Sequence, residues 1–195
     1  MIIHGATNRQ GVNAMRVFLD SARELKRVRG LVVAAMLLAL QVVLGLVAAI
    51  PVGPSIRISF GYLALSAAGA LLGPAVAPIN GALADVIVFL IRPTGPYFPG
   101  FTVTGLVSGF IYGLMLYRRD VTLRRLLVTK LLIDLICNLL LNTIWIHMLY
   151  GKALFALLPS RALKNLIQYP VDVLLMYPVM KKVIPMVRRQ MPYSV

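Results

Sequence analysis

The sequence predicts an all-α integral membrane protein whose membrane domain is a bundle of about six transmembrane helices. Of the 195 residues, 59% are hydrophobic and only 13% are charged, whereas about a quarter of the residues of a soluble domain are charged. The hydrophobic residues also form long uninterrupted blocks, and a helix needs roughly 20 of them to cross a bilayer. These two observations indicate that lipid surrounds most of the chain.

The predicted transmembrane helices follow one another along the chain, separated by residues that end helices. Pro51-Val-Gly-Pro54 ends the first, Gly73-Pro74 makes the turn between the second and the third, and a loop rich in proline and glycine follows the third. We expect the spans at residues 30–50, 56–72, 74–91, 101–117, 126–150 and 161–183.

Lysine and arginine are distributed unevenly over the predicted loops. The N-terminal segment carries six, the loop at 118–125 four and the C-terminal tail four, against five on the other side. By the positive-inside rule both termini are cytoplasmic, and we expect a multi-pass protein of the cell membrane. We interpret the net charge of +14 as a topology signal and an attraction to anionic lipid, and not as nucleic-acid binding.

Three regions make up the predicted organisation. Residues 1–29 are a cytoplasmic segment, in which the alternation of apolar and charged residues at 15–29 predicts an amphipathic helix on the membrane surface. Residues 30–185 are the membrane domain of about six helices, and residues 186–195 are a basic cytoplasmic tail.

Small residues line one face of the fourth span. Gly105, Gly109 and Gly113 recur at four-residue spacing, so they share a helix face. Because small side chains let helix backbones approach closely in lipid, we expect this face to pack against a neighbouring helix.

Polar and charged residues recur within the last two spans. Such residues are costly in lipid and normally face one another or a cavity. In each span they lie three or four residues apart and so share one face, which predicts an interior wall between the two helices. They are Lys130, Asp134, Asn138 and Asn142, with Trp145 about one turn beyond, in the fifth span and Arg161, Lys164, Asn165, Gln168 and Asp172 in the sixth.

Depth in the membrane separates these residues into two groups. Lys130, Asp134 and Asp172 lie in the middle or inner half of their spans. We expect them to form an internal cluster of ion pairs, because unpaired buried charge is costly; contact with a ligand is the alternative. The other polar residues lie in the outer half, at the depth where Asp85 and Arg92 close the third span.

The outer group, with the aromatic residues of the neighbouring loop, predicts a pocket for a ligand that has an anionic end and a flat polar ring. Arginine and lysine would hold the anion, a carboxylate and amides would bond to the ring, and aromatic side chains would stack on it. The alternatives are that the cations reach to lipid headgroups and that the aromatics form an interfacial belt. The candidate residues are Asp85, Arg92, Tyr97, Phe98, Phe101, Asn138, Asn142, Trp145, Arg161 and Lys164.

Catalytic chemistry is not expected of this sequence. An intramembrane serine protease needs a serine and a histidine on facing helices, but the histidine found in a span, His147, lies near an outer end, far from Ser108. The sequence contains no Walker-type phosphate loop and no cluster of metal ligands. We therefore predict that the chain is not an enzyme, has no cofactor or metal, and obtains any energy from partners.

Several short motifs occur along the chain in a defined order. The first span carries Ala35-Met-Leu-Leu-Ala39, and the most specific stretches are Tyr-Phe-Pro-Gly-Phe-Thr (97–102), Ile-Tyr-Gly-Leu (111–114), Leu-Leu-Leu-Asn-Thr-Ile-Trp (139–145) and Pro-Ser-Arg-Ala-Leu-Lys-Asn (159–165). Over residues 30–185 the order and spacing of these motifs resemble the folate-specific substrate-binding (S) components of energy-coupling factor (ECF) transporters.

This resemblance implies an S-component-like bundle that captures folate at the extracellular face and topples in the membrane to deliver it inward. A coupling transmembrane subunit, docked on Ala35 and Ala39, and two ATPase subunits would supply the energy. We expect the pterin ring to lie against Asp85, Asn138, Asn142 and the aromatic residues. We expect the tail carboxylates to lie near Arg92, Lys164 and Arg161.

Other functions remain open at this point. An S component for riboflavin, thiamine or a queuosine precursor would share the fold, and a neutral ligand would make Arg92 and Lys164 dispensable for affinity. A membrane scaffold without a ligand would leave the polar residues of the last two spans as ion pairing alone. An intramembrane hydrolase is disfavoured because a suitably placed histidine is lacking.

Overall fold

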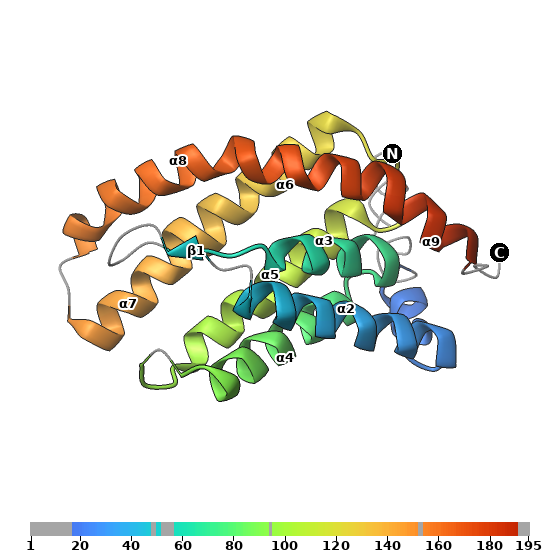
Figure 1. The fold of residues 1–195 in the computed structure, drawn as a ribbon, viewed down its shortest axis with the longest axis horizontal. Helices are drawn as coiled ribbons and strands as arrows, with labels where there is room; N and C mark the ends of the chain where they lie inside the picture. Colours follow the sequence, from blue (N-terminus) through green and yellow to red (C-terminus); the bar gives the residue numbers. More distant parts are fainter. Residues whose placement is uncertain (1–16, 48–49, 52–56, 94, 152–153, 191–195) are drawn as a thin grey trace, which may run out of the picture.

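The computed structural model describes residues 17–47, 50–51, 57–93, 95–151 and 154–190, most of which are helical (Figure 1). Two short strands pair in antiparallel fashion, β1 (Ile50–Pro51) and β2 (Arg57–Ile58). Residues 17–24 form an N-terminal helix. The other helices are α2 (Val28–Leu46), α3 (Gly61–Leu72), α4 (Val76–Ile91), α5 (Pro99–Leu116), α6 (Leu123–Ile133), the π-helix η1 (Asp134–Leu141), α7 (Asn142–Tyr150), α8 (Leu154–Pro178), the π-helix η2 (Val179–Val183) and α9 (Ile184–Gln190).

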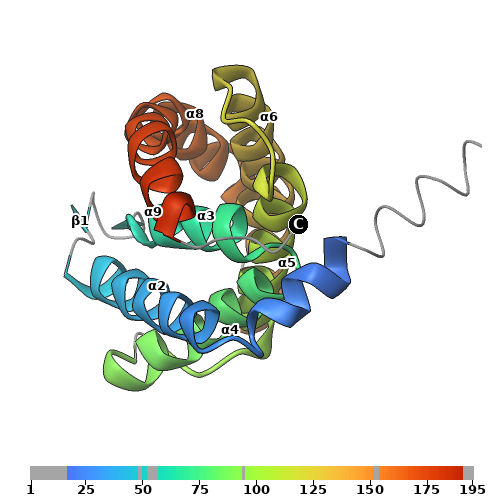
Figure 2. The same ribbon diagram turned by 90° about the vertical axis from the view of Figure 1, so that its right-hand side faces the viewer.

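Helix α3 lies at the centre of the bundle (Figure 1 and Figure 2). Its sequence is almost entirely small and apolar, and ten of its residues are buried, as expected for a helix that is hydrophobic all round. On one side it packs against α2, α4 and α5, and on the other it meets η2 and α9. The continuous α6–η1–α7 segment and α8 complete that second side, and the N-terminal helix and α9 lie at the same end of the molecule (Figure 1).

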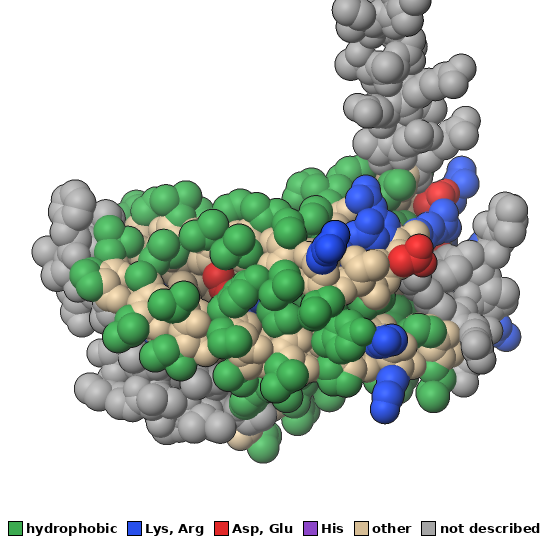
Figure 3. Space-filling view, turned by 90° about the horizontal axis from the view of Figure 1, so that it is seen from above, with side chains coloured by type: hydrophobic (Ala, Val, Ile, Leu, Met, Phe, Trp, Pro, Cys, Tyr) green, Lys and Arg blue, Asp and Glu red, His purple; other side chains and the backbone are tan. Residues whose placement is uncertain are grey.

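Three helical stretches of the described chain are long and apolar enough to cross a membrane: Val28–Leu46, Pro99–Leu116 and Leu123–Leu149. Helices α3 and α4 are apolar but shorter. A space-filling view shows hydrophobic side chains over most of one face, with lysine and arginine gathered at the end that holds the N-terminal helix (Figure 3). This separation of apolar surface from basic end agrees with a membrane protein, while the count of about six spans stays a prediction.

Three predicted helix boundaries are wrong. The first span was expected to reach residue 50, but α2 ends at Leu46 and Ile50 belongs to β1. The second span was expected from residue 56, but the helix begins at Gly61, because Arg57 and Ile58 pair with β1 as a strand. The loop expected before the sixth span is partly helical, since α8 begins at Leu154 and continues through Pro159. Pro159 lies inside this helix, where proline removes one backbone hydrogen bond.

The predicted packing of the glycine face of α5 is confirmed. A Cβ atom on Gly105 would lie 2.6 Å from the carbonyl oxygen of Gly81 in α4, and one on Gly113 would lie 2.5 Å from the Cα of Pro74. Gly109 faces Ala77 in the same way. Backbone-to-backbone approach between α4 and α5 therefore requires these glycines.

The N-terminal helix ends earlier than the predicted amphipathic helix at 15–29, of which residues 15–16 lie outside the described residues. It ends at Glu24, and a turn leads to Val28, where α2 begins. Its buried Ser21 donates to the carbonyl of Leu72 (2.5 Å) and accepts from the N–H of Ala75 (3.0 Å). One hydroxyl thus bonds to a free carbonyl at the end of α3 and to a free N–H at the start of α4. These two bonds attach the N-terminal helix to the bundle.

Candidate ligand-binding site

A cavity of about 410 Å³ lies where α2, α3, α4, α5 and the α6–η1–α7 segment meet. Its glycines, among them Gly81 and Gly105, leave space beside the α4–α5 contact. Polar side chains of the cavity come from every one of these elements or the turns before them: Gln41, Ser59, Tyr62, Asp85, Thr104, Ser108, Asn138 and Asn142. The cavity is therefore a partly open site with polar groups between apolar helices, which is typical of a ligand site.

Two buried acceptors of this cavity have no bonded donor within the described chain. They are the side-chain oxygens of Gln41 and Asn142. A buried polar atom without a partner costs free energy, on the order of 1–3 kcal/mol. Both oxygens are inaccessible to water, so a ligand with N–H or O–H groups would bond to them only once their side chains turn toward the cavity.

A second cavity of about 280 Å³ adjoins the first and shares Asp85, Val88 and Phe101 with it. It is formed by the end of α4, the loop that follows and the end of α7. Its walls are mostly aromatic and apolar, and its charged groups are Asp85 and the exposed Arg92. The two cavities together offer a polar compartment and an aromatic one with a cation.

Asp85 lies at the junction of the two cavities and is held by a short relay of hydroxyl groups. The Thr102 hydroxyl donates to Asp85 Oδ2 (2.7 Å), and its oxygen lies 2.9 Å from the Tyr97 hydroxyl. Since Thr102 gives its proton to the carboxylate, Tyr97 donates to Thr102. This relay fixes one oxygen of Asp85 and leaves the other for a ligand.

Trp145 lines neither of the two described cavities but contacts one residue of each. Its Nε1–H donates to Thr104 (3.0 Å), which lines the first cavity. Its ring packs against Phe98 of the second cavity, with 5.8 Å between ring centroids. Gly100 lies between them, and a Cβ there would come 2.5 Å from both rings. The indole therefore touches a residue of each cavity.

An ion triplet, defined as Lys130, Asp134 and Asp172, lies in the interior beneath the first cavity. Lys130 Nζ is 2.9 Å from Asp134 Oδ1 and 2.8 Å from Asp172 Oδ2, and the side chains are at most 9% exposed. The triplet joins α6 and η1 to α8, which confirms the predicted internal ion-pair cluster. Polar neighbours complete it, because Asn138 donates to Asp134 (2.7 Å) and Gln168 to Asp172 (3.1 Å).

The predicted site residues fall into three places. Asp85, Phe101, Asn138 and Asn142 line the first cavity, with the first two shared. Arg92, Tyr97 and Phe98 line the second, and Trp145 packs behind both. Arg161 and Lys164 line neither cavity as far as the structure describes them.

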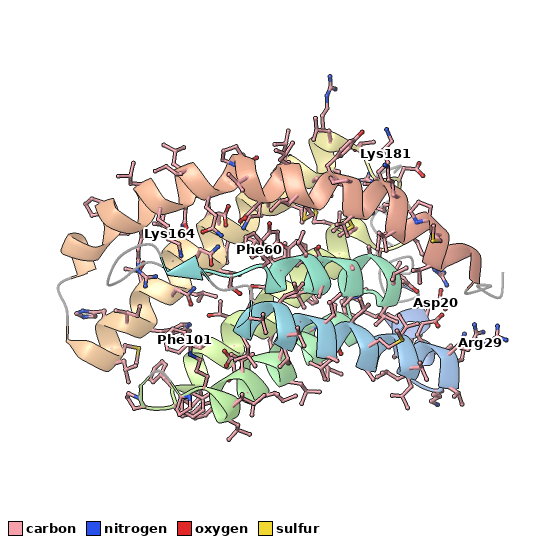
Figure 4. All side chains as sticks on the ribbon, viewed as in Figure 1. Asp20, Arg29, Phe60, Phe101, Lys164 and Lys181 are labelled. Carbon is pink, nitrogen blue, oxygen red and sulfur yellow. The ribbon has the colours of Figure 1, made fainter. Side chains whose placement is uncertain are left out.

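Those two cations are half-buried on α8. Arg161 reaches the backbone carbonyl of Asn138 (3.5 Å) from outside the cavity. In Figure 4, Lys164 lies on the side of α8 that faces β1, and Phe101 lies on the other side of β1, near the start of α5. Both cations thus stand on the α8 side of the site, away from Arg92 at the end of α4.

Sequence reasoning missed several polar residues of the first cavity. Gln41 is a lone amide in the middle of the first predicted span, and Ser59 lies near the start of the second. Tyr62 and Thr104 are each followed four residues later by a serine. A lone amide and rows of hydroxyl groups are weaker signals than the charged and amide row that revealed Asn138. The unpartnered oxygen of Gln41 marks that residue only once the fold is known.

Comparison with known proteins places the chain in a family. The family model described as the substrate-specific component of ECF transporters matches residues 29–180. A protein of Clostridium novyi (strain NT) named folate transporter FolT is 36% identical over 159 residues, which are 82% of this chain and 92% of that protein. A protein of the same name from Leuconostoc mesenteroides is 35% identical over 156 residues, or 76% of this chain and 83% of that one.

A solved structure shares the fold. The crystal structure of FolT bound with folic acid superposes with a TM-score of 0.74 at 32% identity, covering 80% of this chain and 95% of that chain. The family is one of transporter components and not of enzymes, which confirms the prediction that the chain is not an enzyme. The motifs, the helical fold and these comparisons agree, and the chain belongs to the substrate-specific components of ECF transporters.

Proposed function

We propose that this chain is the folate-binding subunit of an ECF-type importer, which captures folate from outside the cell and delivers it inward. The observation that carries the proposal is the polar cavity lined by the acceptor groups of Asp85, Asn138 and Asn142, which adjoins an aromatic cavity with Arg92 in its wall. The pterin ring of folate carries an amino group and a ring N–H, which are the donors that such acceptors require. The relatives named folate transporter and the neighbour solved with folic acid support the same ligand.

The shape of the site suits the two ends of folate. The first cavity, with Asp85, Asn138 and Asn142, would hold the pterin ring, and Phe101 at the junction would stack on it. The aromatic second cavity would hold the middle of the molecule, with Arg92 at its mouth to bind a tail carboxylate. Contact of Arg161 and Lys164 with the tail stays a prediction, since both stand on the α8 side of the site.

Equilibrium binding of folate to the purified protein in detergent tests this proposal. Trp145 is the single tryptophan and touches residues of both cavities, so its fluorescence should be quenched as folate binds in a 1:1 ratio. Riboflavin and thiamine serve as controls. Binding of one of these vitamins instead of folate would keep the function class and change the ligand, and binding of none would favour a scaffold without a ligand.

Transport requires partners, which we propose are a coupling transmembrane subunit and two ATPase subunits, with the S component toppling between its two orientations. Ala35 and Ala39 are exposed on α2 beside the large apolar Met36, which is 67% exposed. Small residues on an exposed face let another helix approach closely in lipid. Both termini would be cytoplasmic in a bacterial plasma membrane.

Replacement of Ala39 by tryptophan tests this docking surface. We expect Ala39→Trp to bind folate as the wild type does and to lose folate uptake in cells that express the partner subunits. Leu174→Trp, at a position that is 74% exposed on α8, is the matched control for a bulky residue on the lipid face and should retain uptake. Full uptake by Ala39→Trp would refute docking at this face.

A further inference from the structure

The ion triplet is next to the first cavity and shares residues with its wall. Lys130 Nζ lies 5.0 Å from the centre of the Tyr62 ring, and Tyr62 lines the cavity. Asn138, which also lines the cavity, donates from Nδ2 to Asp134 Oδ1 at 2.7 Å. Asp134 therefore connects a buried charge cluster to an atom that a ligand can touch.

The carboxylate of Asp134 determines which way the amide of Asn138 points. A carboxylate only accepts hydrogen bonds, so the amide must turn its NH2 toward Asp134. The backbone of Asn138 is held as well, because Arg161 donates to its carbonyl oxygen at 3.5 Å. One N–H of the amide is thus committed to Asp134, and the side-chain oxygen is the acceptor that Asn138 can offer to the cavity.

Asp134 is itself buried and held by an ion pair. Lys130 bonds to the same carboxylate oxygen at 2.9 Å and to Asp172 at 2.8 Å, and the Asp134 side chain is 9% exposed. A buried ion pair of this kind cannot open without leaving a charge uncompensated. The triplet thus supplies the rigidity that an amide needs to keep one orientation.

The orientation of Asn138 agrees with the rest of the cavity. The unpartnered oxygens of Gln41 and Asn142 are acceptors too, among the described residues that line it. An amide oxygen of Asn138 that faces this space favours a ring that donates a hydrogen bond at that edge and penalises a ring that presents an acceptor there, because two acceptors in contact leave both without a donor.

We propose that Asp134 is a positioning residue that determines ligand specificity: held in the ion triplet, it fixes Asn138 so that the cavity selects a ring with a donor at that edge. This inference rests on the proposed binding of folate. It differs from direct recognition because Asp134 acts only through Asn138.

Two ligands that differ in hydrogen-bond polarity test the inference. Folate presents a ring N–H and a carbonyl, whereas its 4-amino analogue presents a bare ring nitrogen and an amino group at the same positions. We expect the wild type to bind folate at least about tenfold more tightly than the analogue, the effect of roughly one mismatched hydrogen bond.

The variants Asp134→Leu and Asp172→Leu form a matched pair, because each removes one carboxylate and leaves Lys130 with the other. In Asp134→Leu the amide of Asn138 is released and can turn to suit either ligand, so the ratio of the two dissociation constants should fall to about one. In Asp172→Leu the amide stays fixed and the ratio should stay as in the wild type. Thermal unfolding of both variants in detergent measures their stability.

Asn138→Leu keeps the whole ion triplet and removes the acceptor, so it should also abolish the discrimination, even if Asp134→Leu does not fold. If Asp134→Leu or Asn138→Leu still bound folate more tightly than the analogue by the wild-type ratio, the inference would be overturned. It would also be overturned if Asp172→Leu lost this preference for folate as fully as Asp134→Leu does. A wild type that binds both ligands equally would overturn the inference alone. A wild type that binds neither would overturn the proposed function and this inference with it.

Discussion

The contact between α4 and α5 makes a quantitative prediction, because backbone meets backbone at the cavity wall. A Cβ on Gly105 would lie 2.6 Å from the oxygen of Gly81, and ordinary van der Waals contact begins near 3.4 Å. Gly105→Ala must therefore move the two helices apart by 3.4 − 2.6 Å, about 0.8 Å. Neither backbone can rotate away as a side chain could, so the strain falls on the whole helix pair.

The change in the free energy of unfolding caused by Gly105→Ala has two parts, the overpacking of the contact and the higher helix propensity of alanine. Overpacking of a close contact costs about 1–3 kcal/mol, and alanine gains up to about 1 kcal/mol over glycine inside a helix. Gly45→Ala is the matched control: it also lies in a helix and lines the cavity, but its Cβ would be 3.5 Å from the Val88 side chain. The difference in stability between the two variants isolates the steric cost, roughly 1–3 kcal/mol.

Thermal unfolding in detergent, followed by Trp145 fluorescence and by loss of the monodisperse peak, measures this difference. We expect Gly105→Ala to unfold at a lower temperature than the wild type and Gly45→Ala to unfold at the same temperature or a higher one. Folate affinity should fall in Gly105→Ala, since the shift changes the cavity wall. If Gly105→Ala were as stable as Gly45→Ala, the close approach of α4 and α5 would be wrong.

Three further predictions concern single polar groups. Thr102→Val removes the hydroxyl that bonds to Asp85 at 2.7 Å and should weaken folate binding about tenfold, whereas Thr102→Ser should bind nearly as the wild type; fluorescence titration compares them. Lys130→Met leaves both carboxylates of the ion triplet uncompensated, which costs about 3–5 kcal/mol, and should yield little monodisperse protein on gel filtration. Ser21→Ala removes both bonds to the α3–α4 turn and should release the N-terminal helix, which limited proteolysis near residues 17–24 would detect as faster cleavage.

Much of the fold was predictable because lipid imposes simple rules. A helix must be apolar where it meets lipid and polar only where it meets protein or a cavity. The expected positions of the helices and the glycine contact of α5 both follow from those rules. The strand pair β1–β2 could not be predicted, since two residues on each side carry too short a pattern to tell a strand from the end of a helix.

The site was less predictable because it depends on residues from elements far apart in sequence. Asn138 and Asn142 were found through their periodicity with Lys130 and Asp134. Gln41 reaches the same cavity from α2, yet a lone amide within an apolar helix has no periodic partner to show which way it faces. Which polar residue faces a cavity and which faces a neighbouring helix is decided by the fold, not by spacing.

The π-helix η1 explains why the polar residues of the fifth span share one line. In an α-helix four residues turn through about 400°, so a row at four-residue spacing drifts by about 40° at each step. Between Lys130 and Asp134 the chain is α-helical, and from Asp134 to Leu141 it is π-helical. A π-helix bonds residue i to i+5 and winds more slowly, so the next steps drift the other way. The π segment thereby keeps Asn138 on the same face as the ion triplet, where Asp134 accepts a hydrogen bond from its amide. On the same face, one step further along the chain, Asn142 lines the cavity.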